Sequence, residues 1–229
     1  MSKDSAESSL GLIPEITVQR LFDERHETLH LKVLNPDIDL DRPVSNPDLS
    51  SPGIALMGYT ERFASDRIQV FGETEIAYLR GLTSEERRER VKGVFSFGIP
   101  VVFVTKGLEL PDGLLEVAAE CSIPVLRSDL STKDFYRHIK PYLDAVLAPR
   151  TNVHGSLADV YGVGLLFVGD SGVGKSECVL DLVERGHRLV ADDHIIVSRR
   201  GPDILLGQGH QRQAHHMEIR GLGIIDIRA

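Results

Sequence analysis

The sequence predicts an α/β fold in two successive domains, and three observations indicate it. Over residues 10–148, short apolar stretches alternate with helical patterns, which is typical of an α/β domain with a largely parallel sheet. A polar stretch at residues 149–154 interrupts this alternation. Residues 165–185 then run from an apolar strand through a glycine-rich loop into a helix, the order in which phosphate-binding loops are built. We therefore expect an N-terminal α/β domain at 10–148 and a P-loop domain at 149–229, after a small polar lead at 1–9 that we expect to be disordered.

Local signals predict the elements of the first domain. The segments 83–86 and 131–134 have the form of a capping box, so each should open a helix. Pro141 lies inside the second of these helices and should kink it. Residues 35–52 are rich in Pro, Asp, Asn and Ser and indicate a loop. The expected helices are 14–25, 74–79, one beginning after Thr83, 111–120 and one beginning after Ser131, and the expected strands are 30–34, 53–58, 68–71, 93–97, 100–105 and 123–126.

The second domain is predicted around the glycine-rich loop. Two paired strands are expected at 160–168, around Tyr161-Gly162-Val163-Gly164, and a helix is expected at 176–185, with Gly186 fitting the position just after its end. Further strands are expected at 188–191, with Asp192 and Asp193 at its end, at 195–198, and within 219–227, with a turn at Gly201-Pro202. The chain stops directly after the apolar run 224–227, and the domain is too short to bury a generous core. We therefore expect this domain to be incomplete at its C-terminus.

The glycine-rich loop fits the pattern G-x-x-x-x-G-K-[ST]. Its candidate phosphate-binding residues are Gly169, Asp170, Ser171, Gly172, Val173, Gly174, Lys175 and Ser176. Glycines allow successive backbone N–H groups to point into one concavity, and the free N–H groups of the following helix face the same anion. We expect Lys175 to reach the β- and γ-phosphates of a nucleotide and the Ser176 hydroxyl to bind Mg²⁺. An ordinary glycine-rich turn is the alternative, and the strand and helix on either side of the loop disfavour it.

Composition narrows the class of partner. The net charge is −8, and no long stripe of Lys and Arg is present, so we expect no nucleic-acid partner. No apolar stretch has the length of a membrane span, so we expect no membrane partner. The two cysteines, Cys121 and Cys178, have no C-x-x-C spacing, which is typical of a reducing, cytoplasmic setting.

Three carboxylates are candidates for chemistry beside the loop. Asp192 and Asp193 follow an apolar strand shortly after the P-loop helix, where a carboxylate can face Mg²⁺ or accept the proton of an attacking hydroxyl. A solvated turn is the equally open alternative. Glu218 lies beside two glycines and a buried strand, and it is either a second Mg²⁺ ligand or a strand-edge charge paired with Arg220.

The sequence gives weaker evidence of a functional role for the histidines. His154 stands just before Gly155 in the segment that leads to the sheet, and a lone loop histidine usually has no special role. His210, His215 and His216 cluster in a Gln/His-rich stretch at 207–216. No Cys or carboxylate spacing completes a metal site there, so we expect a mobile loop.

Four segments together resemble the bacterial HPr kinase/phosphorylase family. They are His154-Gly155, the P-loop as far as Glu177, residues 189–193, and residues 217–226, of which the last is highly specific for that family. The first half of the chain is similar to the family's N-terminal domain at Gly58-Tyr59, Phe63, 67–70 and 75–79. The resemblance covers nearly the whole chain.

The resemblance implies a bifunctional enzyme of carbon catabolite regulation. Such an enzyme uses ATP and Mg²⁺ to phosphorylate a serine of the phosphocarrier protein HPr, and it removes that phosphate with inorganic phosphate, releasing pyrophosphate. By residue match, Asp193 is the base that takes the serine proton and the acid that returns it, and Lys175 neutralises the transferred phosphoryl group. Ser176 and Glu218 hold Mg²⁺, and His154 assists at the active site.

The resemblance also implies an architecture. The N-terminal domain is expected to resemble the first domain of Mur ligases, and the P-loop kinase domain to have a core like that of phosphoenolpyruvate carboxykinase. The family forms hexamers through its C-terminal domain, so a homo-oligomer is expected. Its chains continue well past residue 229, so this chain is expected to be truncated at the C-terminus.

Two other functions remain open at this point. One is a P-loop module that binds nucleotide or phosphate without turnover. The other is a small-molecule kinase related to phosphoenolpyruvate carboxykinase, which the segment 218–226 disfavours.

Overall fold

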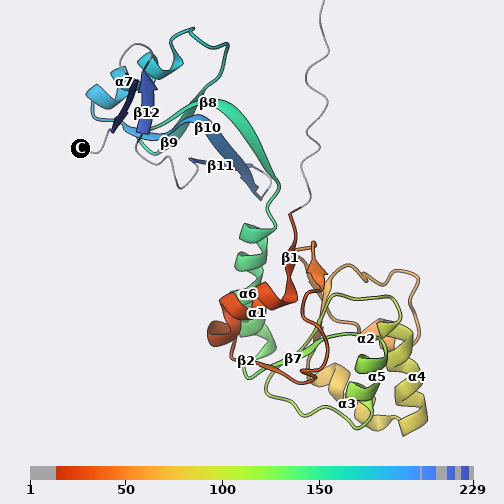
Figure 1. Ribbon diagram of the computed structural model, residues 1–229. Helices are drawn as coiled ribbons and strands as arrows, with labels where there is room; N and C mark the ends of the chain where they lie inside the picture. Colours follow the sequence, from red (N-terminus) through yellow and green to blue (C-terminus); the bar gives the residue numbers. More distant parts are fainter. Residues whose placement is uncertain (1–13, 202, 210–215, 220–222, 227–229) are drawn as a thin grey trace, which may run out of the picture. The chain divides into compact units, whose positions relative to one another are not determined.

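The computed structural model describes residues 14–201, 203–209, 216–219 and 223–226, the last two ranges by their backbone. Contacts within the chain divide it into two compact units, Ile13–Leu147 and Ala148–Ala229, and each is described by itself (Figure 1). The expected lead at 1–9 lies outside the described residues. No helix of the described residues is both long and apolar enough to cross a membrane.

The first unit is built on a five-stranded, largely parallel sheet, which confirms the predicted α/β class. The strand order is β2-β7-β6-β5-β4, and β4 to β7 run parallel while β2 joins β7 antiparallel. The strands are β2 (Leu31–Val33), β4 (Leu49–Ser50), β5 (Ile68–Phe71), β6 (Val102–Val104) and β7 (Val125–Ser128). A separate short pair joins β1 (Ile16–Thr17) to β3 (Pro43–Val44).

Helices cover both faces of this sheet. Successive strand residues point to opposite faces, so Phe103 packs in one hydrophobic cluster and its neighbours Val102 and Val104 pack in the other. The first cluster is closed by α1 (Val18–Leu29) and α6 (Thr132–Val146). The second is closed by α2 (Gly53–Leu56), α3 (Glu73–Gly81), α4 (Ser84–Phe95) and α5 (Leu114–Glu120) (Figure 1).

The predicted helix starts are confirmed by their caps. The Thr83 hydroxyl accepts the Glu86 backbone N–H at 3.3 Å, and the Glu86 carboxylate accepts the Thr83 N–H at 3.0 Å. The Ser131 hydroxyl accepts the Asp134 backbone N–H at 3.1 Å. Each cap satisfies a backbone donor that has no partner inside the helix.

Two predicted strands of the first unit are wrong, because both are helical. Of residues 53–58, expected as a strand, the first four form α2, with Ala55 and Leu56 buried and Ile54 exposed. Of residues 93–97, the first three are the end of α4, where Val91, Val94 and Phe95 are buried at helical spacing. A short apolar run does not by itself distinguish a strand from a buried helix face. The helix expected at 14–25 begins only at Val18, because the two residues before it pair in β1.

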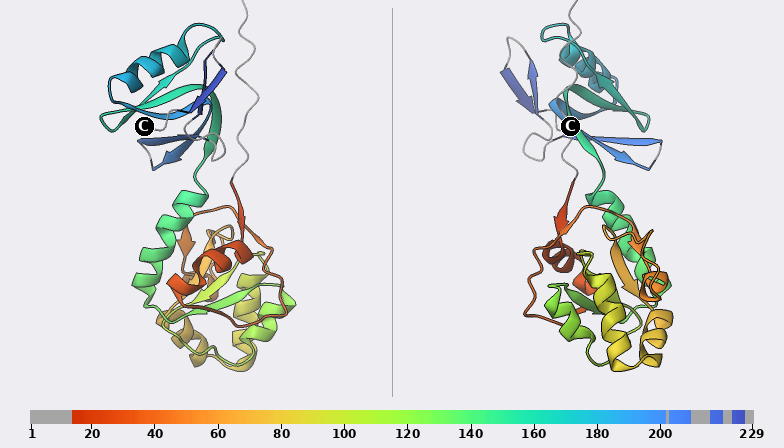
Figure 2. Two further views of the ribbon diagram at one scale, coloured as in Figure 1. Left: turned by 60° about the vertical axis from the view of Figure 1, so that its left-hand side comes forward. Right: turned by 90° about the vertical axis from the view of Figure 1, so that its right-hand side faces the viewer.

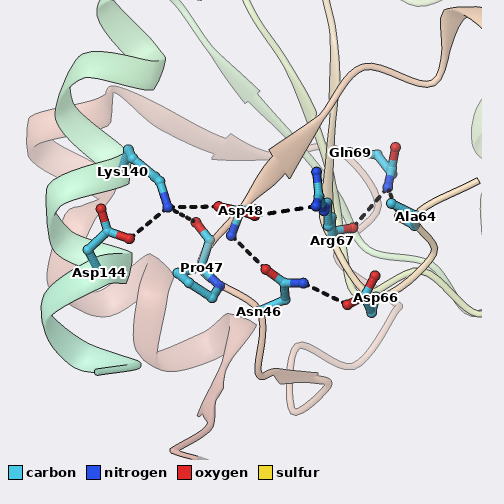
Figure 3. Close-up of polar contacts among 9 residues, drawn as sticks. All are labelled: Asn46, Pro47, Asp48, Ala64, Asp66, Arg67, Gln69, Lys140 and Asp144. Carbon is cyan, nitrogen blue, oxygen red and sulfur yellow. Dashed lines mark hydrogen bonds and ion pairs between the residues drawn. The ribbon is translucent and has the colours of Figure 1, made fainter. Parts of the chain in front are cut away.

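A polar network ties α6 to the segment before β5 (Figure 3). Lys140 Nζ donates to Asp48 Oδ1 at 2.9 Å and to Asp144 Oδ1 at 2.6 Å. Arg67 Nη2 lies 3.4 Å from the other Asp48 oxygen. Asp48 is therefore paired with two cations from different parts of the chain, and the hydrogen bond from Lys140 holds the pKa of its carboxyl below the ordinary value. Pro141 follows Lys140 inside α6, and the kink that it should cause stays a prediction.

In the residues that the structure describes, the second unit is built on a four-stranded antiparallel sheet and the helix α7. The strand order is β11-β10-β8-β9, every neighbour antiparallel. The strands are β8 (Arg150–Val160), β9 (Val163–Phe167), β10 (Arg188–Arg200) and β11 (Ile204–Gly209), with a separate pair of β12 (His216–Ile219) and β13 (Gly223–Asp226). The helix α7 (Lys175–Glu184) covers one face of the sheet and packs Val179 against Ala158 (Figure 2). Gly186, with φ of 90°, follows the end of α7 as predicted.

Two expectations for the second unit are wrong, and cross-strand pairing explains both. The polar residues 149–154, expected to break the pattern, enter strand β8 from Arg150 onward. Asp192 and Asp193, expected to end a strand, lie in the middle of β10, which continues to Arg200. Residues 150–154 pair with 194–198, and Asp192 and Asp193 pair with Ser156 and Gly155, so backbone hydrogen bonds hold strands that hydrophobic alternation does not reveal. The predicted pairing of two strands around residues 161–164 is confirmed by β8 and β9, and the turn between them has φ of 52° at Tyr161 and 85° at Gly162.

The Gln/His-rich stretch is only partly described. Its first three residues, 207–209, belong to β11 rather than to a loop, and residues 210–215 lie outside the described residues. Pro202 and Arg220 also lie outside them, so neither the expected turn at Gly201-Pro202 nor the alternative pairing of Glu218 with Arg220 is described.

Candidate active site

The P-loop connects β9 to α7 and is shaped by three glycines. Gly169, Gly172 and Gly174 have φ of 152°, 88° and 94°, values that residues with a side chain rarely adopt. Gly174 is the N-cap of α7 and supplies no capping side chain. The N–H groups of the first turn of α7 therefore face the loop without a side-chain cap, which is the arrangement that binds anions.

Lys175 lies across this loop. Its ammonium Nζ donates to the backbone carbonyls of Gly169 at 3.0 Å and of Asp170 at 2.9 Å. The positive charge is thus held at the concave side of the loop by two neutral acceptors. A phosphate placed there would replace neutral carbonyl partners with charged oxygens, which form stronger hydrogen bonds.

A cavity of about 360 Å³ opens over the loop and draws residues from three elements. Its lining comprises His154, Gly155 and Ser156 of β8, Asp192 and Asp193 of β10, and Gly169, Ser171, Gly172, Gly174, Lys175, Ser176 and Glu177 of the loop and α7. Asp170 and Val173, also predicted as binding residues, are not among the lining residues, and Val173 is 63% exposed. Most of the predicted loop residues are therefore brought together with His154 and Asp193.

Asp192 connects the loop helix to the sheet. The Ser176 hydroxyl lies 3.3 and 3.2 Å from the two Asp192 carboxylate oxygens, and the Ser156 hydroxyl donates to Oδ1 at 2.5 Å. The sequence marked Asp192 only as one of two adjacent acids, and it gave no role to Ser156. The register of β8 on β10, which places Ser156 opposite Asp192, is the signal that identifies the pair.

Asp193 has a backbone conformation that is unusual inside a strand. Its φ is 72°, in the left-handed region that non-glycine residues seldom occupy. In a regular strand, adjacent side chains point to opposite faces. Asp192 and Asp193 instead line the same cavity, so the left-handed residue brings two consecutive carboxylates to one side.

Two histidines flank the Asp193 carboxylate. His154 Nδ1 lies 3.5 Å from Oδ1, and His194 Nε2 lies 3.4 Å from Oδ2. His154 and Asp193, both predicted as catalytic residues, are therefore adjacent in space. His194 was not predicted, and its position directly after the acid pair was the signal in the sequence.

Gly155 is required by the close approach of β8 to β9. A Cβ atom at this position would lie 2.3 Å from the Phe167 carbonyl oxygen. Phe167 is the last residue of β9 and pairs with Ser156 just before the P-loop begins. The glycine thus allows the strand with His154 and Ser156 to lie close to the strand that carries the loop.

Glu218 is located only by its strand. It lies on β12, opposite Ile224 of β13, and β12 is a spatial neighbour of β10 and α7. These are the elements that carry Asp193 and Ser176, respectively.

The residues around the cavity suit a phosphorylated ligand and Mg²⁺. The Ser176 hydroxyl and the Asp192 carboxylate are adjacent oxygen donors beside the anion-binding loop. Mg²⁺ prefers such oxygens and usually keeps waters and substrate phosphates as its other ligands. A second carboxylate, Asp193, faces the same cavity and can accept a proton.

Comparisons with known proteins match both halves of the chain. The model of the HPr Serine kinase N terminus matches residues 16–143, and that of the HPr Serine kinase C-terminal domain matches residues 145–229. The HPr kinase/phosphorylase of Bacillus cereus (strain AH820) is 42% identical over 201 residues, covering 88% of this chain. That of Exiguobacterium sp. (strain AT1b) is 43% identical over the same share.

The chain spans 65% of the length of these two relatives. Among solved structures, the Hpr(Ser) kinase/phosphatase from Coxiella burnetii matches with 34% sequence identity and a TM-score of 0.32. That match covers 34% of this chain and 51% of the other.

Proposed function

The chain belongs to the HPr serine kinase family, and we propose that it transfers the γ-phosphoryl group of ATP to a serine of HPr and removes it again by phosphorolysis. One observation carries the proposal. A phosphate-binding loop, the Ser176–Asp192 contact and the His154–Asp193 pair border a single cavity. Phosphoryl transfer depends on positioning and charge neutralisation more than on covalent catalysis, and these groups supply both.

The loop would bind the nucleotide phosphates. The N–H groups at the start of α7 and the ammonium of Lys175 face the place where negative charge develops on the transferred group. Ser176, Asp192 and Glu218 would hold Mg²⁺, which neutralises charge on the phosphate oxygens when bound. The Ser176–Asp192 contact and the place of Glu218 on β12 support this assignment.

Asp193 would act as the general base. Its carboxylate takes the proton of the HPr serine hydroxyl as the serine oxygen attacks the γ-phosphorus and ADP leaves. In the opposite direction, inorganic phosphate attacks the phosphoserine, pyrophosphate forms, and Asp193 returns the proton to the serine oxygen. His154, 3.5 Å away, orients the carboxylate.

A two-direction assay tests the proposal. The protein is incubated with ATP, Mg²⁺ and HPr, and phosphoserine is measured by mass spectrometry; phosphoserine-HPr with inorganic phosphate should release pyrophosphate. Asp193→Asn should slow both reactions by roughly 10²- to 10⁴-fold and retain ATP binding, whereas Lys175→Ala should weaken ATP binding itself. ATP binding with no transfer in either direction would contradict the proposal and favour a nucleotide-binding module without turnover.

We further propose the architecture and setting that the family resemblance implies. The domains would be 10–148, similar to the first domain of Mur ligases, and 149–229, a kinase domain with a core like that of phosphoenolpyruvate carboxykinase. The enzyme would be a cytoplasmic hexamer that serves carbon catabolite regulation, and the two free cysteines fit a reducing compartment. Light scattering of the purified protein tests the oligomeric state.

A further inference from the structure

Three metal-ligating groups converge at the edge of the P-loop cavity. They are His154, Asp193 and His194, and one donor atom from each lies within 4.8 Å of the other two. Asp193 is the base of the proposed reaction, but His194 has no part in that reaction.

The backbone holds these groups together. His154 and His194 are directly opposite each other in the register of β8 on β10, and their ring centroids are 4.4 Å apart. Both residues lie inside long strands, of eleven and thirteen residues. The left-handed conformation of Asp193 turns its carboxylate to the same side as the two rings. The cluster is therefore set by strand pairing and not by flexible side chains alone.

The spacing matches the ligands of a tetrahedral metal ion. Nitrogen and oxygen ligands lie about 2.0–2.2 Å from Zn²⁺, so two of them on one tetrahedral ion are about 3.4 Å apart. The Asp193 oxygens lie 3.5 Å from His154 Nδ1 and 3.4 Å from His194 Nε2. These two distances end on different Asp193 oxygens, and one donor atom of each residue lies within 4.8 Å of the others, so rotation of the side chains must bring the three donors onto one ion.

The donor set selects the type of ion. Two imidazoles and one carboxylate suit Zn²⁺ and similar transition metals, whereas Mg²⁺ prefers oxygen ligands alone. The side chains of His154, Asp193 and His194 are 75%, 65% and 52% exposed. A water molecule can therefore complete the coordination, and an ion can enter from solvent.

We propose that His154, Asp193 and His194 form a Zn²⁺ site that is separate from the Mg²⁺ ligands and blocks the base when it is filled. Zn²⁺ bound to one Asp193 oxygen would withdraw electron density from the carboxylate, and the lowered basicity of the other oxygen would keep it from taking the serine proton. The binding half of this proposal is independent of the enzyme's activity, and the inhibitory half rests on the proposed function.

Direct binding is the first test. The full chain, saturated with Mg²⁺, is titrated with Zn²⁺ against a chromophoric chelator, without ATP or HPr. His194→Asn should weaken one site by at least about tenfold, because even outer-shell partners of metal ligands account for roughly 10- to 100-fold in affinity. His138→Asn, at an exposed histidine of α6, should leave that site unchanged. Cobalt(II) should give visible absorption bands with the wild type that His194→Asn removes.

The Gln/His-rich stretch provides a second control. Its three histidines are replaced together, as His210→Asn, His215→Asn and His216→Asn. This variant should keep the site that His194→Asn removes. Zinc affinity that is equal in the wild type and His194→Asn, or that disappears with the triple variant instead, would overturn the proposal.

Inhibition is the second test, and each variant is compared with itself with and without zinc. At free Zn²⁺ ten times the measured Kd and saturating Mg²⁺, phosphoryl transfer by the wild type should fall about tenfold, since about one site in eleven stays empty. His194→Asn should lose this sensitivity. Zinc binding at the three residues without inhibition would refute the inhibitory half, and a wild type that transfers no phosphate even without zinc would refute only the proposed function.

Discussion

Gly155→Ala should separate β8 from β9 and damage the P-loop cavity. The added Cβ would lie 2.3 Å from the Phe167 carbonyl oxygen, about 1 Å closer than ordinary van der Waals contact allows. The obstacle is backbone and not the end of a flexible side chain, so one strand must move. Overpacking of this kind costs about 1–3 kcal/mol of unfolding free energy.

Gly155→Ala should also weaken ATP binding, because the displaced pairing lies between β8, which carries His154 and Ser156, and β9, which leads into the P-loop. Phe167 pairs with Ser156, and the P-loop begins two residues later. A destabilisation of about 2 kcal/mol corresponds to a fall in Tm of roughly 8–16 °C for a unit of 60–100 residues. Circular dichroism measures the Tm, and calorimetry with ATP measures the affinity, which should fall as well.

Gly164→Ala is the matched control in the same hairpin. Its Cβ would meet only a Leu157 side-chain carbon, at 3.5 Å, which is an ordinary contact. This variant should unfold and bind ATP almost as the wild type does. If Gly155→Ala matched Gly164→Ala in both Tm and ATP affinity, the close approach of the two strands would not be the reason for the glycine.

Three further predictions concern single groups. Asp193→Asn should lower kcat for phosphoryl transfer by roughly 10²- to 10⁴-fold, because general-base catalysis contributes a factor of that size. ATP affinity should change little, because asparagine tolerates the left-handed backbone conformation of this position. A kcat equal to that of the wild type would exclude Asp193 as the base. Lys140 holds the pKa of the Asp48 carboxyl below its ordinary value. The ion pair should therefore stabilise the first unit fully at a pH above the ordinary pKa, and this stabilisation should be lost as the pH falls through the lowered pKa. The Lys140 and Asp48 side chains are both more than a third exposed, so Asp48→Asn should lower the free energy of unfolding by under about 1 kcal/mol at pH 7 and not at all at strongly acid pH. Urea unfolding at the two pH values measures this difference. A loss of stability that is the same at both pH values would contradict the ion pair. Thr83→Ala should cost about 1 kcal/mol by loss of the α4 cap, with Thr83→Ser near the wild type, and equal unfolding midpoints for both variants would exclude a capping role.

Signals carried within a few neighbouring residues predicted their structures correctly. The caps at Thr83 and Ser131 start helices, Tyr161-Gly162 turns between two strands, and Gly186 follows the end of α7. Each of these depends on the conformation or hydrogen bonding of adjacent residues. The P-loop is of the same kind, because one continuous segment supplies its glycines, its lysine and the start of its helix.

Elements that depend on distant partners were predicted poorly. Residues 53–56 and 93–95 form helix because their apolar side chains pack on one cluster beneath the sheet, which a short apolar run does not reveal. The polar residues 150–154 form a strand because they pair with residues 194–198, which lie forty or more positions later. Periodicity within a segment contains no information about such pairing.

The residues of the candidate site fall into the same two groups, those indicated by the sequence and those that only the pairing of distant strands brings together. The sequence by itself determined the phosphate-binding loop, and the resemblance pointed to His154, Asp193 and Glu218. Only the tertiary structure showed that Asp192 joins Ser176 to Ser156, and that His194 completes a cluster with His154 and Asp193. The physical reason is that β-strand register and one left-handed residue decide which side chains meet, and both are properties of the paired strands.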